Sequence, residues 1–140
     1  DGLVTNYDDR FQYGEDMVMS GKWGRNISAD LGVVTTILGS RGKDTVDVLP
    51  KNILATAALQ KKLADGDIVF WVKDPKRRSV EEIVAHLSIV RIKSGKPYLI
   101  HASGSKNQWG TPNGGVVKEV SFTHYVRTTR FIGAFITRFE

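Results

Sequence analysis

The run Asp67-Ile68-Val69-Phe70-Trp71-Val72 begins the central segment of this sequence, which ends at Ser103. A short apolar run of this length, rich in β-branched and aromatic residues, indicates a buried strand. After a basic insertion, residues 85–92 and 97–103 alternate in the manner of two further strands. Between them lies Lys93-Ser94-Gly95-Lys96, whose Ser-Gly centre predicts a tight hairpin turn.

The register of this hairpin follows from its turn. If Ser94-Gly95 forms the two-residue loop, counting back along both strands places Ser88 opposite His101 and His86 opposite Ser103. Side chains alternate between the two faces of a strand, so these four side chains are predicted to share one face. A slip of one residue would put the two histidines on opposite faces.

On one face, the imidazoles of His86 and His101 are diagonal neighbours, roughly 5 to 8 Å apart at their Cβ atoms. Two adjacent imidazoles indicate a base with an orienting partner, because a neutral imidazole accepts a proton only in one fixed tautomer. The alternative is that each is a polar residue satisfied near a strand end. Spacing alone leaves both interpretations open.

Three segments carry a family resemblance: Gly66–Trp71, His86–Val90 and Leu99–Ser103. Together they resemble the ordered motifs of the NlpC-type peptidoglycan hydrolases, which are papain-like cysteine peptidases and amidases of bacterial cell walls. The resemblance implies that the first motif is a core strand, that His86 is the catalytic general base, and that His101 orients it.

The upstream chain resembles one subgroup more closely. Asp1–Tyr7 and Arg10–Tyr13 are similar to the segment that follows the nucleophile helix in the N-acetylmuramoyl-L-alanine amidase-like subgroup. The nucleophile of the family is a cysteine, and this sequence contains none. We therefore expect residues 1–140 to form a single domain that lacks its N-terminal nucleophile helix, as a fragment or processed form. A true pseudoenzyme is the other explanation.

The expected fold class is α+β: a papain-like (NlpC-type) domain in which an antiparallel sheet has helices packed on one side. Its strands lie near residues 67, 86, 97, 116 and 130, and the last of them is expected to be central or well covered because it is strongly apolar. A helix is predicted over Leu54 to Ala64, capped by Asn52.

The charge composition of the chain limits the classes of binding partner to be expected. The chain carries 20 Lys and Arg against 15 acidic residues, a formal net charge of +5, which favours polyanionic surroundings. The insertion holds Lys73, Lys76, Arg77 and Arg78, a cluster that could contact phosphates. Because no aromatic platform is interleaved with it, we predict no nucleic-acid partner. No apolar run approaches the roughly 18 residues of a transmembrane helix.

By the resemblance, the partner is peptidoglycan or a muropeptide, the location is the bacterial cell envelope, periplasmic or secreted, and no cofactor is required. The reaction is amide cleavage by a cysteine-histidine-histidine mechanism. We predict Ser88, Ser103 and Trp109 as substrate-binding residues; Trp109 could equally pin its loop to the core.

Two alternatives remain. A zinc hydrolase would use His86 and His101 with His124 or Asp67, but the usual paired-histidine helix motif is missing, and His124 is expected on the surface. The other is a non-catalytic peptidoglycan-binding or protein-interaction module on the same fold.

Overall fold

The computed structural model describes residues 17–39, 45–77, 83–103 and 116–140. The elements in chain order are β1 (Arg25–Asn26), α2 (Ser28–Leu31), β2 (Thr35–Leu38), β3 (Thr45–Pro50), α3 (Lys51–Leu54), α4 (Ala57–Gln60), β4 (Ile68–Val72), the 3-10 turn η4 (Pro75–Arg77), β5 (Val84–Lys93), β6 (Lys96–Ser103), β7 (Val116–Ser121), α5 (Phe122–Thr128) and β8 (Gly133–Arg138).

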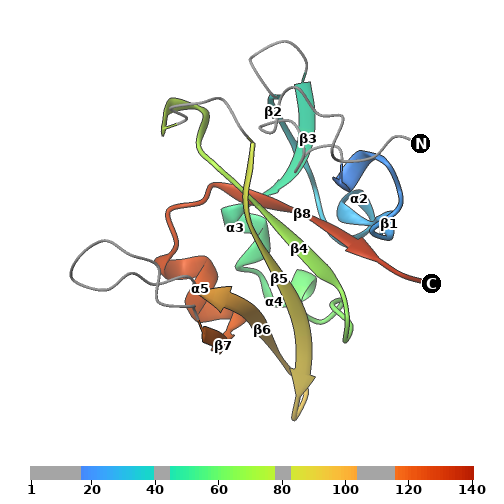
Figure 1. Cartoon of the computed structure of the whole chain (residues 1–140), viewed down its shortest axis with the longest axis vertical. Helices are drawn as coiled ribbons and strands as arrows, with labels where there is room; N and C mark the ends of the chain where they lie inside the picture. The colour runs from blue at the N-terminus through green and yellow to red at the C-terminus, as the bar shows by residue number, and fades with distance from the viewer. Residues whose placement is uncertain (1–16, 40–44, 78–82, 104–115) are drawn as a thin grey trace.

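The strands form one antiparallel sheet in the order β2-β3-β8-β4-β5-β6-β7, and β1 also pairs with β8. Figure 1 shows β8 crossing the middle of the molecule between β3 and β4. The prediction of an α+β fold with an antiparallel sheet is therefore confirmed, as is the central position of the final strand.

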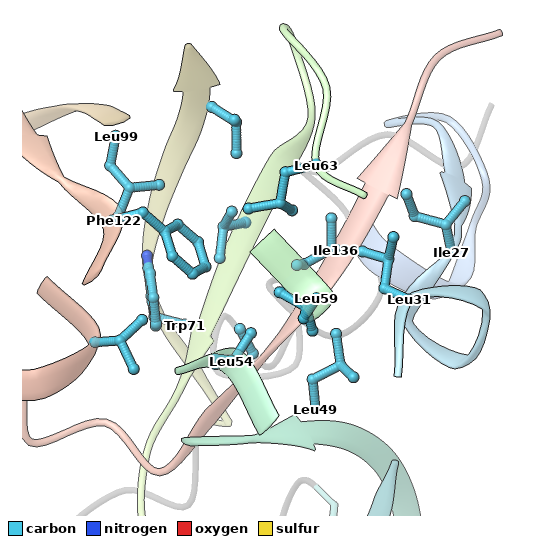
Figure 2. Packing of buried hydrophobic residues seen from close by; sticks show 14 residues of the cluster. Ile27, Leu31, Leu49, Leu54, Leu59, Leu63, Trp71, Leu99, Phe122 and Ile136 are labelled. Carbon is cyan, nitrogen blue, oxygen red and sulfur yellow. The ribbon is translucent and has the colours of Figure 1, made fainter. Parts of the chain in front are cut away.

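One face of the sheet packs against the helices. Trp71 of β4 and Ile136 of β8 meet Leu54, Leu59 and Phe122, which come from α3, α4 and α5, in one buried cluster. Figure 2 shows these side chains converging between sheet and helices. Because α2 contributes Leu31 to the same cluster, α2, α3, α4 and α5 all pack on the same side of the sheet.

A second buried cluster lies on the opposite face. It contains Ile68, Phe70 and Val72 of β4 together with Phe135 of β8 and Val18. Every residue of β4 is thus buried, with alternate side chains entering opposite clusters. This explains why the β4 sequence is continuously apolar rather than alternating.

The helix predicted over Leu54 to Ala64 is wrong in extent. Pro50 occupies the N-cap position of α3, which ends at Leu54, and a separate short helix, α4, starts after Thr56. The Thr56 hydroxyl donates to the Ile53 carbonyl and accepts from the Leu59 backbone N–H. It therefore caps a new helix instead of continuing the old one.

Gly133 allows β3 and β8 to approach closely. A Cβ atom at this position would lie 2.4 Å from the Leu49 carbonyl oxygen, so the pairing of Pro50 with Gly133 requires glycine. In the described residues, no helix has the length and hydropathy that crossing a membrane requires.

Candidate active site

The β5–β6 hairpin has the predicted turn. Lys93 pairs with Lys96, and both loop residues have positive φ, 52° at Ser94 and 75° at Gly95. Two successive positive φ values are the signature of the type I′ turn, whose twist matches that of the flanking strands. The predicted register is therefore confirmed as far as the pair Ile89 and Ile100.

The two histidines meet on the helix-covered face. Nε2 of His86 lies 2.8 Å from Nδ1 of His101, and the rings are nearly perpendicular, at 87° with centroids 4.9 Å apart. This distance is that of a direct hydrogen bond. The expectation that both imidazoles share a face and reach each other is confirmed.

A β-bulge sits beside His86. Trp71 pairs with His86, but the next recorded pair is Val72 with Val84, so Ala85 is an extra residue on β5. A bulge bends the strand and re-aims the adjacent side chain. Here it allows His86 to stay on the same face as Trp71 while the strand turns away.

Aromatic rings surround the pair. The Phe131 ring is stacked on His86, with centroids 6.4 Å apart and an interplanar angle of 8°. The Tyr125 ring lies 5.5 Å from His101 and 6.3 Å from His86, and it also packs on Trp71 at 4.8 Å. These rings limit the orientations open to both imidazoles.

Ser88 holds the side chain of Trp71, the residue that pairs with His86. It is fully buried, and its Oγ accepts a hydrogen bond of 3.0 Å from the indole Nε1–H of Trp71. Buried indole N–H groups need such a partner. The structure thus places this hydroxyl in the core under Trp71 and not on a surface that a substrate could touch.

Both imidazoles have lowered pKa values. Burial lowers the pKa of His86 most, and the neighbouring His101 lowers it further. Burial also lowers the pKa of His101, with a smaller effect from the positive charge of Lys118, its opposite residue on β7. Both rings are therefore neutral near pH 7, and their hydrogen bond uses one proton.

Two neutral arrangements satisfy that hydrogen bond. Either Nε2–H of His86 donates to Nδ1 of His101, or Nδ1–H of His101 donates to Nε2 of His86. In the first arrangement Nδ1 of His86 is an unprotonated base. Nε2 of His101 is buried and has no hydrogen-bond partner among the described residues, so it is open to one further hydrogen bond.

Tyr125 adds a phenol beside this pair. Burial raises its pKa, while a hydrogen bond with Thr129 acts in the opposite direction. The phenol is therefore protonated and uncharged at neutral pH, so it contributes no negative charge that would raise the histidine pKa values.

An open cavity of about 620 Å³ lies near the pair, at the start of β5. Phe131, which stacks on His86, forms part of its wall. The described residues that line it are Lys73, Asp74, Arg77, Ala85, Arg130 and Phe131.

The remaining predicted residues are placed as follows. Trp109 lies outside the described residues, as does the Ser103 side chain, although the Ser103 backbone pairs with Val116 at the end of β6. His124 is exposed on α5, as expected. Asp67 is buried and bound by Arg138, and in the described ranges no three His, Cys, Asp or Glu residues gather as metal ligands.

The sequence pattern did not predict Tyr125, Phe131 and Arg130 as residues of the site. A signal existed for Tyr125, since Phe122, Tyr125 and Val126 have the i, i+3, i+4 spacing of one helix face. Phe131 and Arg130 precede β8 without a local motif. Their position depends on the pairing of β8 with β4, which is a long-range contact.

No family model and no curated protein matches the chain. Among solved structures, it resembles two of an N-acetylmuramoyl-L-alanine amidase from Bacteroides uniformis ATCC 8492. Their TM-scores are 0.66 and 0.65, both at 18% identity, covering 100% and 99% of this chain and 69% and 68% of those chains. A Bacteroides fragilis protein provisionally named a xylanase has a TM-score of 0.61 at 15% identity, covering 99% of this chain and 68% of that one. At these identities the likeness establishes the fold: the chain shares its α+β architecture with these Bacteroides proteins.

Proposed function

We propose that this chain is the histidine-bearing part of a bacterial cell-wall amidase that cleaves an amide bond in peptidoglycan. The observation that carries the proposal is the 2.8 Å hydrogen bond between His86 and His101 beside an open cavity. The fold likeness to an N-acetylmuramoyl-L-alanine amidase supports it. We further propose the cysteine-histidine-histidine mechanism of the NlpC-type hydrolases.

The geometry assigns a role to each imidazole nitrogen in this mechanism. Because Nε2 of His86 bonds to His101, Nδ1 is the nitrogen of His86 left to accept a thiol proton. The thiolate attacks the amide carbonyl, and His86 then returns the proton to the leaving amine. Water hydrolyses the resulting thioester. His101 accepts the Nε2–H of His86 throughout and stabilises the imidazolium that forms.

In this proposal the thiol comes from a segment that precedes residue 1. The sequence has no cysteine, and each amidase structure extends beyond the region that matches this chain. Ser103 and Trp109 remain proposed substrate contacts. Ser88 instead has a positioning role, because its hydroxyl holds the Trp71 indole by a hydrogen bond. The proposed location is the cell envelope.

A second candidate is a peptidoglycan-binding module without catalysis. The absence of cysteine favours it directly, since this chain alone offers no thiolate. The imidazole pair and cavity would then bind a muropeptide without cleaving it. The two candidates share the ligand and differ in turnover.

The test begins with the coding sequence upstream of Asp1. If it encodes a cysteine at the start of a helix, the longer protein should cleave muropeptides, measured as new amino groups by mass spectrometry. His86→Ala and His101→Ala should each abolish cleavage, whereas His124→Ala, which alters an exposed histidine on α5, should retain it. Cleavage that survives His86→Ala refutes the mechanism. A longer protein that binds muropeptides without cleaving them establishes the binding module.

A further inference from the structure

The basic insertion that follows β4 has a place in the structure that the proposed reaction does not use. Lys73, Arg77 and Arg130 line the 620 Å³ cavity, and Asp74 is the acidic residue among its described lining residues. A cavity of this size suits a small ligand or one or two residues of a peptide. Among the described residues of its wall, positive charge therefore predominates.

The acid in this wall is already engaged. Asp74 Oδ1 accepts a 3.0 Å hydrogen bond from the Lys76 backbone N–H, and the Asp74 carbonyl accepts one of 2.8 Å from Arg77 N–H. These bonds hold the η4 turn. In contrast, the guanidinium groups of Arg77 and Arg130 make no recorded ion pair within the described part of the chain. Both are exposed and can bind an anion.

The cavity and the imidazole pair share Phe131 as a neighbour. Phe131 stacks on His86 and also forms part of the cavity wall. Ala85, the extra residue of the bulge, lines the cavity and directly precedes His86. A molecule bound between Arg77 and Arg130 therefore lies in a cavity whose wall includes two neighbours of the proposed base, Phe131 and Ala85.

We propose that this cavity is a carboxylate-binding subsite, in which Arg77 and Arg130 hold a free carboxylate of the substrate beside the amide at His86. This inference rests on the proposed function, since it places the same substrate. Arginine binds a planar carboxylate through paired N–H donors. The volume of about 620 Å³ suits a compact carboxylate better than an extended nucleic-acid backbone.

The experiment follows binding by NMR, using the chain as it is. The signals observed are the Nε–H groups of Arg77 and Arg130 and the imidazoles of His86 and His101. The ligands are a muramoyl tetrapeptide, the same compound with its carboxylates amidated, succinate, and inorganic phosphate. The variants are Arg77→Gln and Arg130→Gln. Arg91→Gln is the control of equal charge change, because Arg91 is exposed on β5 beside Glu119.

The muramoyl tetrapeptide should shift both arginine signals and both imidazoles. Amidation, Arg77→Gln and Arg130→Gln should each weaken binding about tenfold or more, the effect of losing charge-assisted hydrogen bonds, while Arg91→Gln should not. Equal affinity for the amidated compound, or unchanged binding by both cavity variants, overturns the subsite. Phosphate binding more tightly than succinate at the same arginines overturns the carboxylate assignment.

Failure of the proposed function gives a different pattern. If the tetrapeptide does not bind but succinate shifts the two arginine signals, and Arg130→Gln abolishes that shift, the carboxylate site stands and the peptidoglycan substrate is wrong. If neither compound shifts these signals, the subsite is wrong, and the amidase proposal is still decided by the cleavage assay.

Discussion

At the scale of single residues, the site is defined by how each imidazole nitrogen is used. Nε2 of His86 and Nδ1 of His101 bond to each other, and Phe131 and Tyr125 restrict both rings. Burial lowers both pKa values, so the pair is uncharged near pH 7 and can accept a proton there. Orientation comes from the ring contacts and neutrality from burial.

The lowered pKa values predict how stability depends on pH. The unfolded chain, with histidine pKa values near about 6.5, binds protons more tightly than the folded chain. The free energy of unfolding should therefore be highest above this value and decrease as the pH falls from it through the folded-state pKa values. Urea unfolding between about pH 7.5 and pH 5 measures this.

Substitutions test whether the His86–His101 pair causes this pH dependence of stability. His86→Gln should flatten the decrease, and His124→Gln, at an exposed position, should leave it as in the parent chain. A slope that is identical in the parent and His86→Gln proteins would show that the imidazole pair is not the source.

Ser88→Ala should destabilise the fold around the site. It removes the acceptor of the buried Trp71 Nε1–H, and an unsatisfied buried donor costs about 1–3 kcal/mol. Urea unfolding followed by tryptophan fluorescence measures the loss. Ser20→Ala, which removes an exposed hydroxyl, is the control. No difference between the two variants would mean that the buried hydrogen bond contributes little.

At the scale of elements, the sequence predicted what local rules determine. The Ser94-Gly95 turn and the alternation of its two strands were sufficient to place both histidines on one face. The break between α3 and α4 was missed because Thr56, a permissible helix residue, acts as a cap here. The stacking of Phe131 on His86 was not predicted, because it depends on the pairing of β4 with β8, which are far apart in the sequence.

The hairpin turn can be improved. Ser94 has a φ of 52°, a left-handed conformation that asparagine tolerates better than serine does. Ser94→Asn should therefore stabilise the chain by about 0.5 kcal/mol, and Ser94→Val should destabilise it by about 1 kcal/mol. Thermal unfolding midpoints would report both changes. The same sign for both variants would contradict the type I′ assignment.

An ion pair joins the start of β4 to the end of β8. Asp67 is fully buried, and its carboxylate accepts hydrogen bonds of 2.7 and 2.8 Å from Arg138. Asp67→Ala should destabilise the fold by about 3 kcal/mol, since it leaves a partly buried guanidinium without its carboxylate. Chemical unfolding measures the change.

The matched control lies close by. Arg25 pairs with Asp30 and Glu140 at exposed positions, and Arg25→Gln should lower the free energy of unfolding much less than Asp67→Ala does. Equal losses in the two variants would show that burial of Asp67 adds no strength to its pair.

For the protein as a whole, the net charge is positive, and the fold is shared with larger proteins. The net charge is +5, and the cavity beside the histidines is lined by three of the basic residues. Attraction to an anionic wall polymer would act over the entire surface, whereas the cavity would select one carboxylate. These two contributions are separable because salt screens the first more strongly.

Retention on purified peptidoglycan should therefore decrease as salt rises from about 0.05 to 0.5 M, where the screening length becomes only a few ångströms. Co-sedimentation measures the bound fraction. Chitin, an uncharged polysaccharide, is the control and should retain little of the chain at any salt concentration. Retention on peptidoglycan that does not change with salt would exclude long-range electrostatic attraction.

The position of β8 between β3 and β4 has a consequence for biosynthesis. While the chain emerges from the ribosome, the β2–β3 ribbon and the β4–β7 meander have no strand to join them, and the inner edges of both remain unpaired. Only when β8 has been translated can it enter the gap and fuse the two halves. The nascent protein is thus prone to aggregation until β8 has been synthesised, and chaperones that shield open strand edges would act in that interval.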